Sequence, residues 1–220
     1  MLCIVTAGPT YEPLDSVRRL TNFSTGRLGS ELAAFLASRG HEVRLLLSEL
    51  AQAKTNFPAN RRTELFTTTS DLAERIHALS SSPVDAVFHA AAVSDFRFGK
   101  IWAGALEGQP TEIKSGKIST REGALLAELV PTTKIIAQLR GWFPKARLVG
   151  WKYEVDGDRA AVIRLGQEQI SECKTDACVA NGPAYGAGFG LVQADSACEH
   201  APDEAALFQA LEHFIRKTKT

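Results

Sequence analysis

Short apolar runs alternate along the chain with longer amphipathic stretches. The first apolar run covers residues 2–6 and ends in an Ala-Gly-Pro-Thr turn, and an apolar run bounded by turn residues predicts a buried strand. A helical pattern begins near Gly26, because Leu28, Leu32 and Leu36 fall on one helical face. Further strands are predicted at residues 42–47, 85–90, 147–151 and 177–180, and further helices at residues 72–79, 132–139, 159–172 and 203–214. This alternation predicts an α/β fold with a doubly wound, Rossmann-like parallel sheet that carries helices on both faces.

The pattern changes between residues 96 and 130, where glycine and proline punctuate short polar segments. Such punctuation interrupts both the helical and the strand period. We predict a flexible arm or lid over residues 97–128, attached to a single domain that spans residues 1–220.

Lysine and arginine together number 25 and equal the 25 aspartates and glutamates. A chain without net charge has no overall positive field to hold a nucleic acid or an acidic membrane, so neither is expected as a partner. The chain also lacks an apolar run of about 18 residues and a signal-peptide pattern, which predicts a cytoplasmic protein. Its four cysteines fit neither a disulfide framework nor a Cys-x-x-Cys metal site.

Ligands of an open parallel sheet bind beyond the carboxyl ends of its strands, so the loops there are the candidate sites. The segment 22–29, Asn-Phe-Ser-Thr-Gly-Arg-Leu-Gly, leads into the first predicted helix. Gly26 and Gly29 allow a close approach, and Ser24 and the free N–H groups of the helix start offer donors to a phosphate. The spacing is that of neither a dinucleotide fold nor a P-loop, and a simple cap and turn is the alternative interpretation.

Three further loops carry candidate residues. Three alanines at 90–92 precede Asp95, a pattern that suits either a closely passing ligand or small-residue packing. Lys117 lies on the arm, where a lysine is either solvated or brought to a phosphate by lid closure. Trp151 and Asn181 stand at predicted strand ends, where they suit stacking on a base and hydrogen bonding to it, although Trp151 also suits a core position.

Taken together, these segments resemble the phosphopantothenate–cysteine ligase family, also called phosphopantothenoylcysteine synthetases. The resemblance covers most of the chain. It rests on Thr-Ala-Gly-Pro-Thr at 6–10, Glu-Pro-Leu-Asp at 12–15, Asn-Phe-Ser-Thr-Gly-Arg at 22–27, Ala-Ala-Ala-Val-Ser-Asp-Phe at 90–96, Lys-Ile-Ser at 117–119, Leu-Val-Pro at 129–131 and Val-Ala-Asn at 179–181.

The resemblance implies an enzyme that joins L-cysteine to 4′-phosphopantothenate in coenzyme A biosynthesis. In that reaction the pantothenate carboxylate attacks the α-phosphate of a nucleoside triphosphate, and pyrophosphate leaves. The amine of cysteine then attacks the acyl-nucleotidylate and releases the nucleoside monophosphate. The co-substrate would be ATP or CTP with Mg²⁺, and ATP is favoured slightly. The length of 220 residues implies a stand-alone ligase with no flavin in this chain.

The resemblance also implies roles for particular residues. Positions that match the family's nucleotide site are Gly8, Ser24, Gly26, Gly29, Lys117, Trp151 and Asn181. Positions that match its phosphopantothenate site are Arg18, Asn22, Ala91, Ala92 and Asp95. Within these sets, Asn22, Lys117 and Asp95 are the expected catalytic residues. Arg18 matches an arginine that the family supplies from the neighbouring subunit, which implies a homodimer with a shared active site.

Two other classes of protein compete with this resemblance. An NAD(P)-binding Rossmann oxidoreductase needs Gly-x-Gly-x-x-Gly directly after the first strand, and the sequence has only Gly8 there. A non-catalytic regulatory paralogue that keeps the fold is the second class. Loss of Asn22, Asp95 or Lys117 would favour it, and all three residues are present.

Overall fold

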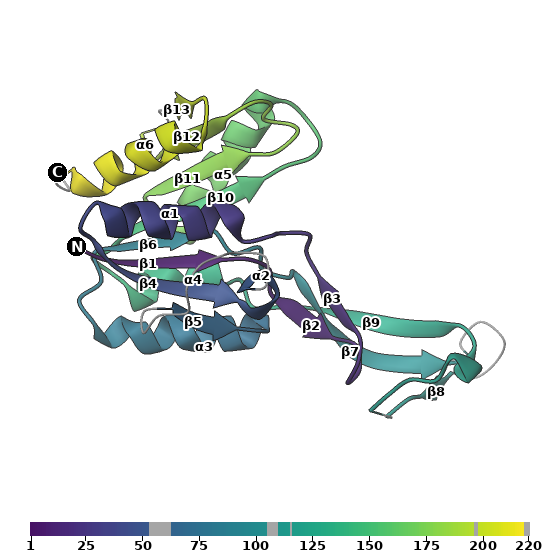
Figure 1. Cartoon of the computed structure of the whole chain (residues 1–220). Helices are drawn as coiled ribbons and strands as arrows, with labels where there is room; N and C mark the ends of the chain where they lie inside the picture. The colour runs from purple at the N-terminus through teal and green to yellow at the C-terminus, as the bar shows by residue number, and fades with distance from the viewer. Residues whose placement is uncertain (53–62, 105–109, 115, 196–197, 218–220) are drawn as a thin grey trace.

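A sheet of parallel strands forms the centre of the molecule (Figure 1). The computed structural model describes residues 1–52, 63–104, 110–114, 116–195 and 198–217. The parallel strands are β1 (Leu2–Ala7), β4 (Glu42–Ser48), β5 (Thr63–Phe66), β6 (Ala86–His89), β10 (Arg147–Tyr153) and β11 (Ala177–Asn181). Two antiparallel strands, β12 (Phe189–Gln193) and β13 (Cys198–Ala201), extend one edge. Within the described residues the order is β13-β12-β11-β10-β6-β1-β4-β5.

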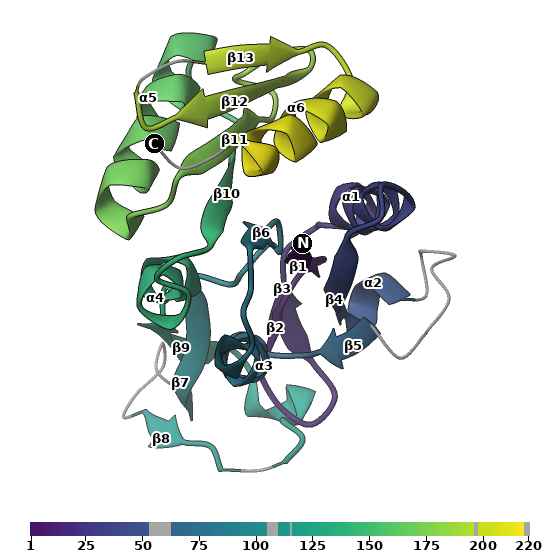
Figure 2. The ribbon, with the colours of Figure 1, turned by 90° about the vertical axis from the view of Figure 1, so that its left-hand side faces the viewer.

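Helices cover both faces of this sheet (Figure 2). α1 (Arg27–Ser38) and α6 (Glu204–Arg216) pack on one face, and α3 (Thr69–Ala78), α4 (Ile135–Trp142) and α5 (Arg159–Cys173) pack on the other. A short α2 (Glu49–Gln52) follows β4, and single 3-10 turns occupy Leu79–Ser81 and Thr120–Glu122. None of the helices in the described parts of the chain is long and apolar enough to cross a bilayer.

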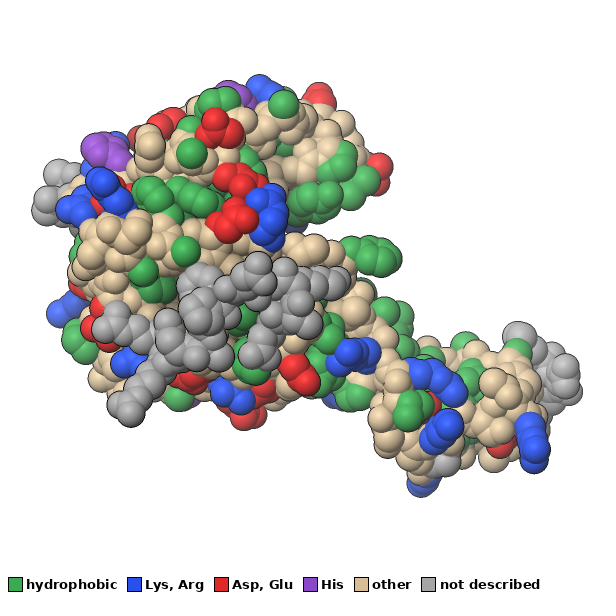
Figure 3. Space-filling view, viewed as in Figure 1, with side chains coloured by type: hydrophobic (Ala, Val, Ile, Leu, Met, Phe, Trp, Pro, Cys, Tyr) green, Lys and Arg blue, Asp and Glu red, His purple; other side chains and the backbone are tan. Residues whose placement is uncertain are grey.

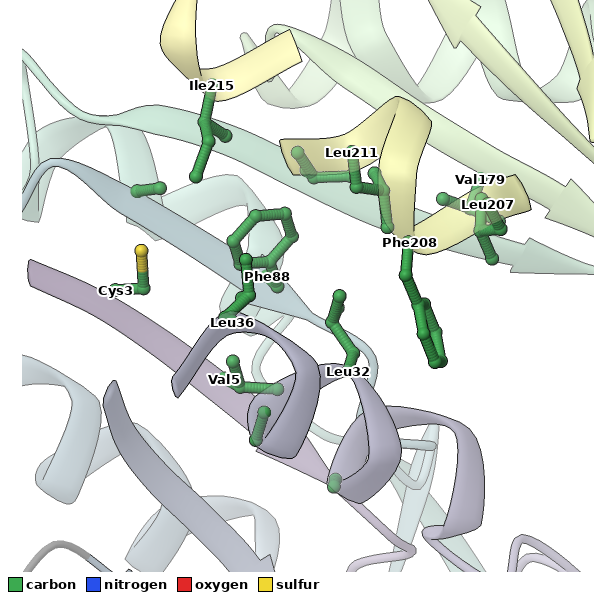
Figure 4. Packing of buried hydrophobic residues seen from close by; sticks show 14 of the residues in the cluster. Cys3, Val5, Leu32, Leu36, Phe88, Val179, Leu207, Phe208, Leu211 and Ile215 are labelled. Carbon is green, nitrogen blue, oxygen red and sulfur yellow. The ribbon is translucent and has the colours of Figure 1, made fainter. Parts of the chain in front are cut away.

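The two faces of the sheet have separate apolar cores because successive side chains of a strand point to opposite faces. On β1, Val5 belongs to the core beneath α1 and α6, whereas Ile4 belongs to the core beneath α3 and α4. Figure 4 shows how Leu32 of α1 and Leu211 of α6 converge on the first of these cores. The apolar strand side chains that alternate between the two faces therefore form the surfaces on which the helices pack.

A smaller pair of sheets projects from the carboxyl side of the central sheet (Figure 1). The hairpin of β2 (Tyr11–Pro13) and β3 (Arg19–Thr21) lies beside an antiparallel sheet of β7 (Phe96–Ala103), β8 (Thr111–Glu112) and β9 (Leu125–Pro131). We call β7, β8, β9 and the segment between them the arm. Lysine and arginine side chains are prominent on its surface (Figure 3).

The doubly wound α/β fold expected from the sequence is confirmed, and each predicted strand and helix overlaps an observed one. The sheet is mostly parallel, and β12 and β13 run antiparallel at one edge. β2, β3, α2 and β5 were not predicted. These elements have three or four residues each, which is too few for a hydrophobic period to show.

Candidate functional site

The loops after β1 and β6 meet at the carboxyl edge of the sheet. The N–H of Ala92 donates to the carbonyl of Gly8 at 3.1 Å, and the N–H of Thr10 donates to the carbonyl of Ala92 at 3.1 Å. Gly8 adopts a φ of 90°, and a β-carbon there would lie 2.7 Å from Cβ of Ser48. Gly8 is therefore needed for the loop to pass close to the end of β4.

Asn22 joins this junction from the loop that precedes α1. Its Nδ2 donates to the carbonyl of Ala92 at 3.2 Å and to that of Val93 at 3.3 Å. Both amide hydrogens are thereby engaged, so Oδ1 is the atom that Asn22 offers to a ligand. The structure thus brings Asn22, Ala91 and Ala92 together, and Asp95 lies exposed at the end of the same loop.

The start of α1 has a geometry and charge distribution that suit an anion. Gly26 occupies the N-cap with a φ of 74° and makes no side-chain cap, and the first turn carries no acidic residue. The N–H groups of a helix start lack partners within the helix and attract negative charge. Ser30, 3% exposed, adds a buried hydroxyl with no hydrogen-bond partner among the described residues.

Close packing fixes this helix start against the sheet. A β-carbon on Gly29 would lie 2.7 Å from Cβ of Ala7. Ser24 accepts from the N–H of Gly26 at 3.4 Å, so its hydroxyl supports the turn into the helix. The glycines of this segment therefore serve the approach of α1 to β1 as well as any ligand.

An ion-pair network stands beside the α1 start and was not predicted. Arg27 donates to Glu204 at 2.8 Å and to Glu31 at 3.0 Å. Hydrogen bonds to these two carboxylates raise the pKa of Arg27 further above its usual value. The network links the first turns of α1 and α6, which are far apart in the sequence.

His89 is a second feature that the sequence analysis missed. It is the last residue of β6, is 5% exposed, and places Nδ1 at 3.0 Å from Oγ1 of Thr6. The same hydroxyl accepts from the N–H of Ala91 at 3.1 Å. Burial lowers the pKa of His89 to about 4, so the imidazole is neutral at pH 7. The available signal was a lone polar residue inside an apolar strand.

Trp151 and Asn181 differ in their positions along their strands. Trp151 lies inside β10 and packs against the core shared with α1 and α6, so the expectation of a position at the strand end is wrong. Asn181 is the last residue of β11. In the described structure, Nε1 of Trp151 and Oδ1 of Asn181 are buried without a hydrogen-bond partner. Their strand positions place both side chains on the α1 face of the sheet.

Arg18 and Lys117 come together at the turn between β2 and β3. Arg18 donates to the carbonyl of Ile118 at 2.9 Å and lies 3.5 Å from a carboxylate oxygen of Asp15. Lys117 is exposed and directly precedes Ile118. In this chain Arg18 therefore contacts the arm of its own subunit.

The four cysteines are free thiols, as expected. Burial raises the pKa of Cys3 and of Cys178 to about 12. Thiolates are the reactive form of cysteine, so these two side chains serve the core and not the chemistry.

Comparison with known proteins gives the chain a family and a fold. Residues 2–204 match the family model described as the DNA/pantothenate metabolism flavoprotein C-terminal domain. The chain is 33% identical over 180 residues to the coenzyme A biosynthesis bifunctional protein CoaBC of Thermococcus kodakarensis, a match that covers 81% of this chain and 40% of that protein. The chain spans less than half the length of the curated relatives it matches.

Solved structures agree in fold. The DNA/pantothenate metabolism flavoprotein of Streptococcus pneumoniae has a TM-score of 0.85 at 24% identity, and the match covers 98% of both chains. A structure described as a Cab2 H337A mutant in complex with phosphopantothenate-cysteine has a TM-score of 0.72 at 17% identity, over 97% of this chain and 84% of that chain. At these identities the likeness shows the fold.

These findings correct the family, function and enzyme class expected from the sequence motifs. The matching family is that of a pantothenate-metabolism flavoprotein domain, and its curated relative is a bifunctional coenzyme A protein; neither bears the name of a cysteine ligase. The assignment to phosphopantothenate–cysteine ligases is therefore withdrawn, together with ATP or CTP and Mg²⁺ as its co-substrates. The exclusion of a flavin is also corrected, because the family description names a flavoprotein.

Proposed function

The chain belongs to the family of DNA/pantothenate metabolism flavoprotein C-terminal domains, and from this premise we propose that it acts in coenzyme A biosynthesis by binding a phosphorylated pantothenate derivative. The observation that carries the proposal is the uncapped start of α1, set beside the junction of Asn22 with Ala92. The helix start suits a phosphate, and the junction suits the hydroxyl and amide groups of pantothenate.

The α1 start supplies the phosphate site. Gly26 and Gly29 let the start of α1 lie close to Ala51 and Ala7, and Gly8 and Ser24 support the adjoining turns. The helix dipole favours negative charge at this end. Because the chain has no net charge, such a local site is what draws an anionic substrate to it.

Asn22, Ala91, Ala92 and Asp95 supply the site for the pantothenate body. Pantothenate carries hydroxyl and amide N–H groups, and the free Oδ1 of Asn22 accepts a hydrogen bond from either kind. The alanines leave room for the ligand to pass over the end of β6. Asp95, exposed on the same loop, adds a carboxylate that accepts hydrogen bonds or a proton.

Trp151, Asn181, Arg18 and Lys117 complete the proposed ligand-binding set. The unpaired polar atoms of Trp151 and Asn181 need partners, because a buried polar group without one is costly. A second part of the ligand that lies over the α1 face would supply them. Lys117 and Arg18 carry positive charge on the arm and its neighbouring hairpin, where they attract the anionic substrate.

The family description also implies a flavin, without saying which part of the parent protein holds it. The α1 start would suit the phosphate of FMN as it suits any phosphate, and Gly26, Gly29 and Ser30 would hold it. A bound flavin supplies a two-electron acceptor. The residues of this chain bind and orient the phosphorylated substrate in either case.

Isothermal titration calorimetry tests the proposal. We expect 4′-phosphopantothenate or 4′-phosphopantothenoylcysteine to bind about tenfold or more tightly than unphosphorylated pantothenate, because the phosphate adds charge-assisted hydrogen bonds. Asn22→Ala should weaken binding about tenfold, whereas Gln138→Ala on the exposed face of α4 should leave it unchanged. Absence of binding by both phosphorylated compounds would contradict the proposal. Titration with FMN, followed by flavin absorbance, separately tests for a flavin site.

We also propose that the chain forms a homodimer through the hairpin and the arm. Apolar side chains that are well exposed gather on these elements: Val17, Leu20, Phe96, Leu125, Leu126 and Leu129. Exposed apolar surface on neighbouring elements favours association. A dimer that pairs these surfaces would place Arg18 near the partner, as a shared site requires.

A further inference from the structure

Asp15 is an almost completely buried carboxylate at the tip of the β2–β3 hairpin. Its side chain is 1% exposed. Oδ1 accepts from the N–H of Val17 at 2.9 Å and from the N–H of Arg18 at 2.8 Å. These two bonds close the hairpin turn locally, as aspartate commonly does.

The other carboxylate oxygen of Asp15 reaches a segment about one hundred residues away in the sequence. Oδ2 accepts from the N–H of Ile118 at 3.2 Å and lies 3.5 Å from the Arg18 guanidinium. Arg18 in turn donates to the carbonyl of Ile118 at 2.9 Å. Both backbone groups of Ile118 are therefore bonded to the hairpin.

Two further observations show that this contact is a formed structure. The N–H of Ser16 donates to the carbonyl of Gly116 at 2.8 Å, so residues on both sides of Lys117 are attached. Ile118 is 2% exposed, although its neighbours Lys117 and Ser119 are exposed. The burial of one apolar side chain and three hydrogen bonds thus hold residues 116–118 against the hairpin tip.

We infer that Asp15 is a positioning residue that fixes residues 116–118 of the arm to the β2–β3 hairpin, and so sets where Lys117 stands. The two carboxylate oxygens of Asp15 have different roles. Oδ1 shapes the hairpin turn, and Oδ2 holds the arm. This role concerns the conformation of the arm and does not depend on the proposed function.

The charge state of Asp15 suits this role. Hydrogen bonds from the backbone of Val17, Ile118 and Arg18, with the Arg18 guanidinium, hold the pKa of Asp15 below its usual value. A carboxylate that accepts several N–H bonds remains an acceptor through the neutral range. The contact is therefore present wherever the protein is folded near pH 7.

The substitution Asp15→Asn distinguishes the roles of the two carboxylate oxygens. Asp15→Asn keeps one acceptor for the turn, but its amide nitrogen cannot accept from Ile118 and does not attract Arg18. Hydrogen exchange of the Ile118 amide, and tryptic cleavage after Lys117 followed by mass spectrometry, report on the arm contact. Both rates should rise about tenfold in Asp15→Asn, since hydrogen bonds to charged groups are the stronger ones. Asp156→Asn, at an exposed aspartate after β10, is the matched control and should change neither.

The melting temperature distinguishes a positioning role from a structural one. Asp15→Asn should melt within a few degrees of the wild type, because the core elements are untouched. Unchanged exchange at Ile118 and unchanged cleavage after Lys117 would overturn the inference. If Asp15→Asn instead lowers the melting temperature strongly, exchange of Ile118 relative to the core amide of Val5 decides the question. An equal rise at both would also overturn it.

Discussion

His89 shows how a single buried side chain ties two strands to one loop. Its ring contacts Thr6 on the neighbouring strand β1, and Thr6 accepts from the backbone of Ala91 just beyond β6. Thr6 lies 83 residues from His89 and 85 residues from Ala91 in the sequence. The sequence displays each residue, but their contact exists only because β1 and β6 pair in parallel.

We expect His89 to make stability fall as the medium is acidified. Its pKa is lowered from 6.5 to about 4 in the folded state by burial. Between these values the unfolded chain binds a proton that the folded chain excludes, so stability present above pH 6.5 is lost as the pH falls toward 4. The full effect is of the order of 3 kcal/mol.

Urea unfolding at a series of pH values from about 4.5 to about 7.5, spaced about half a pH unit apart, measures this dependence. His89→Asn keeps an acceptor for Thr6 and removes the titration, so its stability should vary less with pH than that of the wild type. The difference between the two proteins isolates His89 from the carboxylates that also titrate. Parallel curves for the two proteins would show that His89 is not responsible.

At the residue scale, the sequence was most informative where a residue acts through its own backbone neighbours. The Gly26 turn and the small residues at 90–92 could be recognised because a helix start and a strand end have local patterns. The contact between Asn22 and Ala92 agrees with grouping them in one site. The pairing of Arg18 with Asp15 and Ile118 was not predictable, because it joins segments that only the fold brings together.

At the scale of elements, the packing of α1 on β1 depends on a glycine. Gly29→Ala would place a β-carbon 2.7 Å from Cβ of Ala7 and 3.2 Å from the carbonyl oxygen of Thr6. The helix must then move away from the strand, which we expect to cost about 1–3 kcal/mol. Gly141→Ala in α4 is the matched control, because its β-carbon meets nothing within 4 Å.

Thermal and urea unfolding of both variants test this packing. Gly141→Ala should be neutral or more stable by up to about 1 kcal/mol, since alanine is the better helix former. Equal stability of the two variants would mean that α1 adjusts without loss. In that case the contact between α1 and β1 would not limit the residue at position 29.

Elements were predictable in proportion to their length and periodicity. The long amphipathic helices and the buried strands β1, β4, β6, β10 and β11 carry clear patterns. The antiparallel pair β12 and β13 was missed, because its strands have five and four residues and lie in a glycine-rich part of the chain. The arm was anticipated as a change of pattern, whereas its three strands become evident only from their mutual pairing.

At the scale of the whole molecule, we predict a dimer that depends on the arm. Sedimentation velocity at tens of micromolar should show a dimer of the wild type, and Leu126→Lys combined with Leu129→Lys should weaken association about tenfold or more. These side chains are 54% and 50% exposed in one chain, so the substitutions leave its core intact.

Val155→Lys serves as the control for this prediction. Val155 is 61% exposed but follows β10 and belongs to neither the hairpin nor the arm. The control should sediment like the wild type. A monomeric wild type, or a double variant that remains fully dimeric, would show that the exposed leucines do not form the interface.

The sequence by itself determined the layered α/β fold, because hydrophobic periodicity reports which face of each element is buried. It also located the start of α1, since a glycine-rich turn before an amphipathic helix is a local pattern. Tertiary structure alone decided which distant groups meet: His89 with Thr6, Arg27 with Glu204, and Asp15 with Ile118. The physical reason is that hydrogen bonds and ion pairs across long separations depend on strand order and loop path, which leave no periodic trace in the chain.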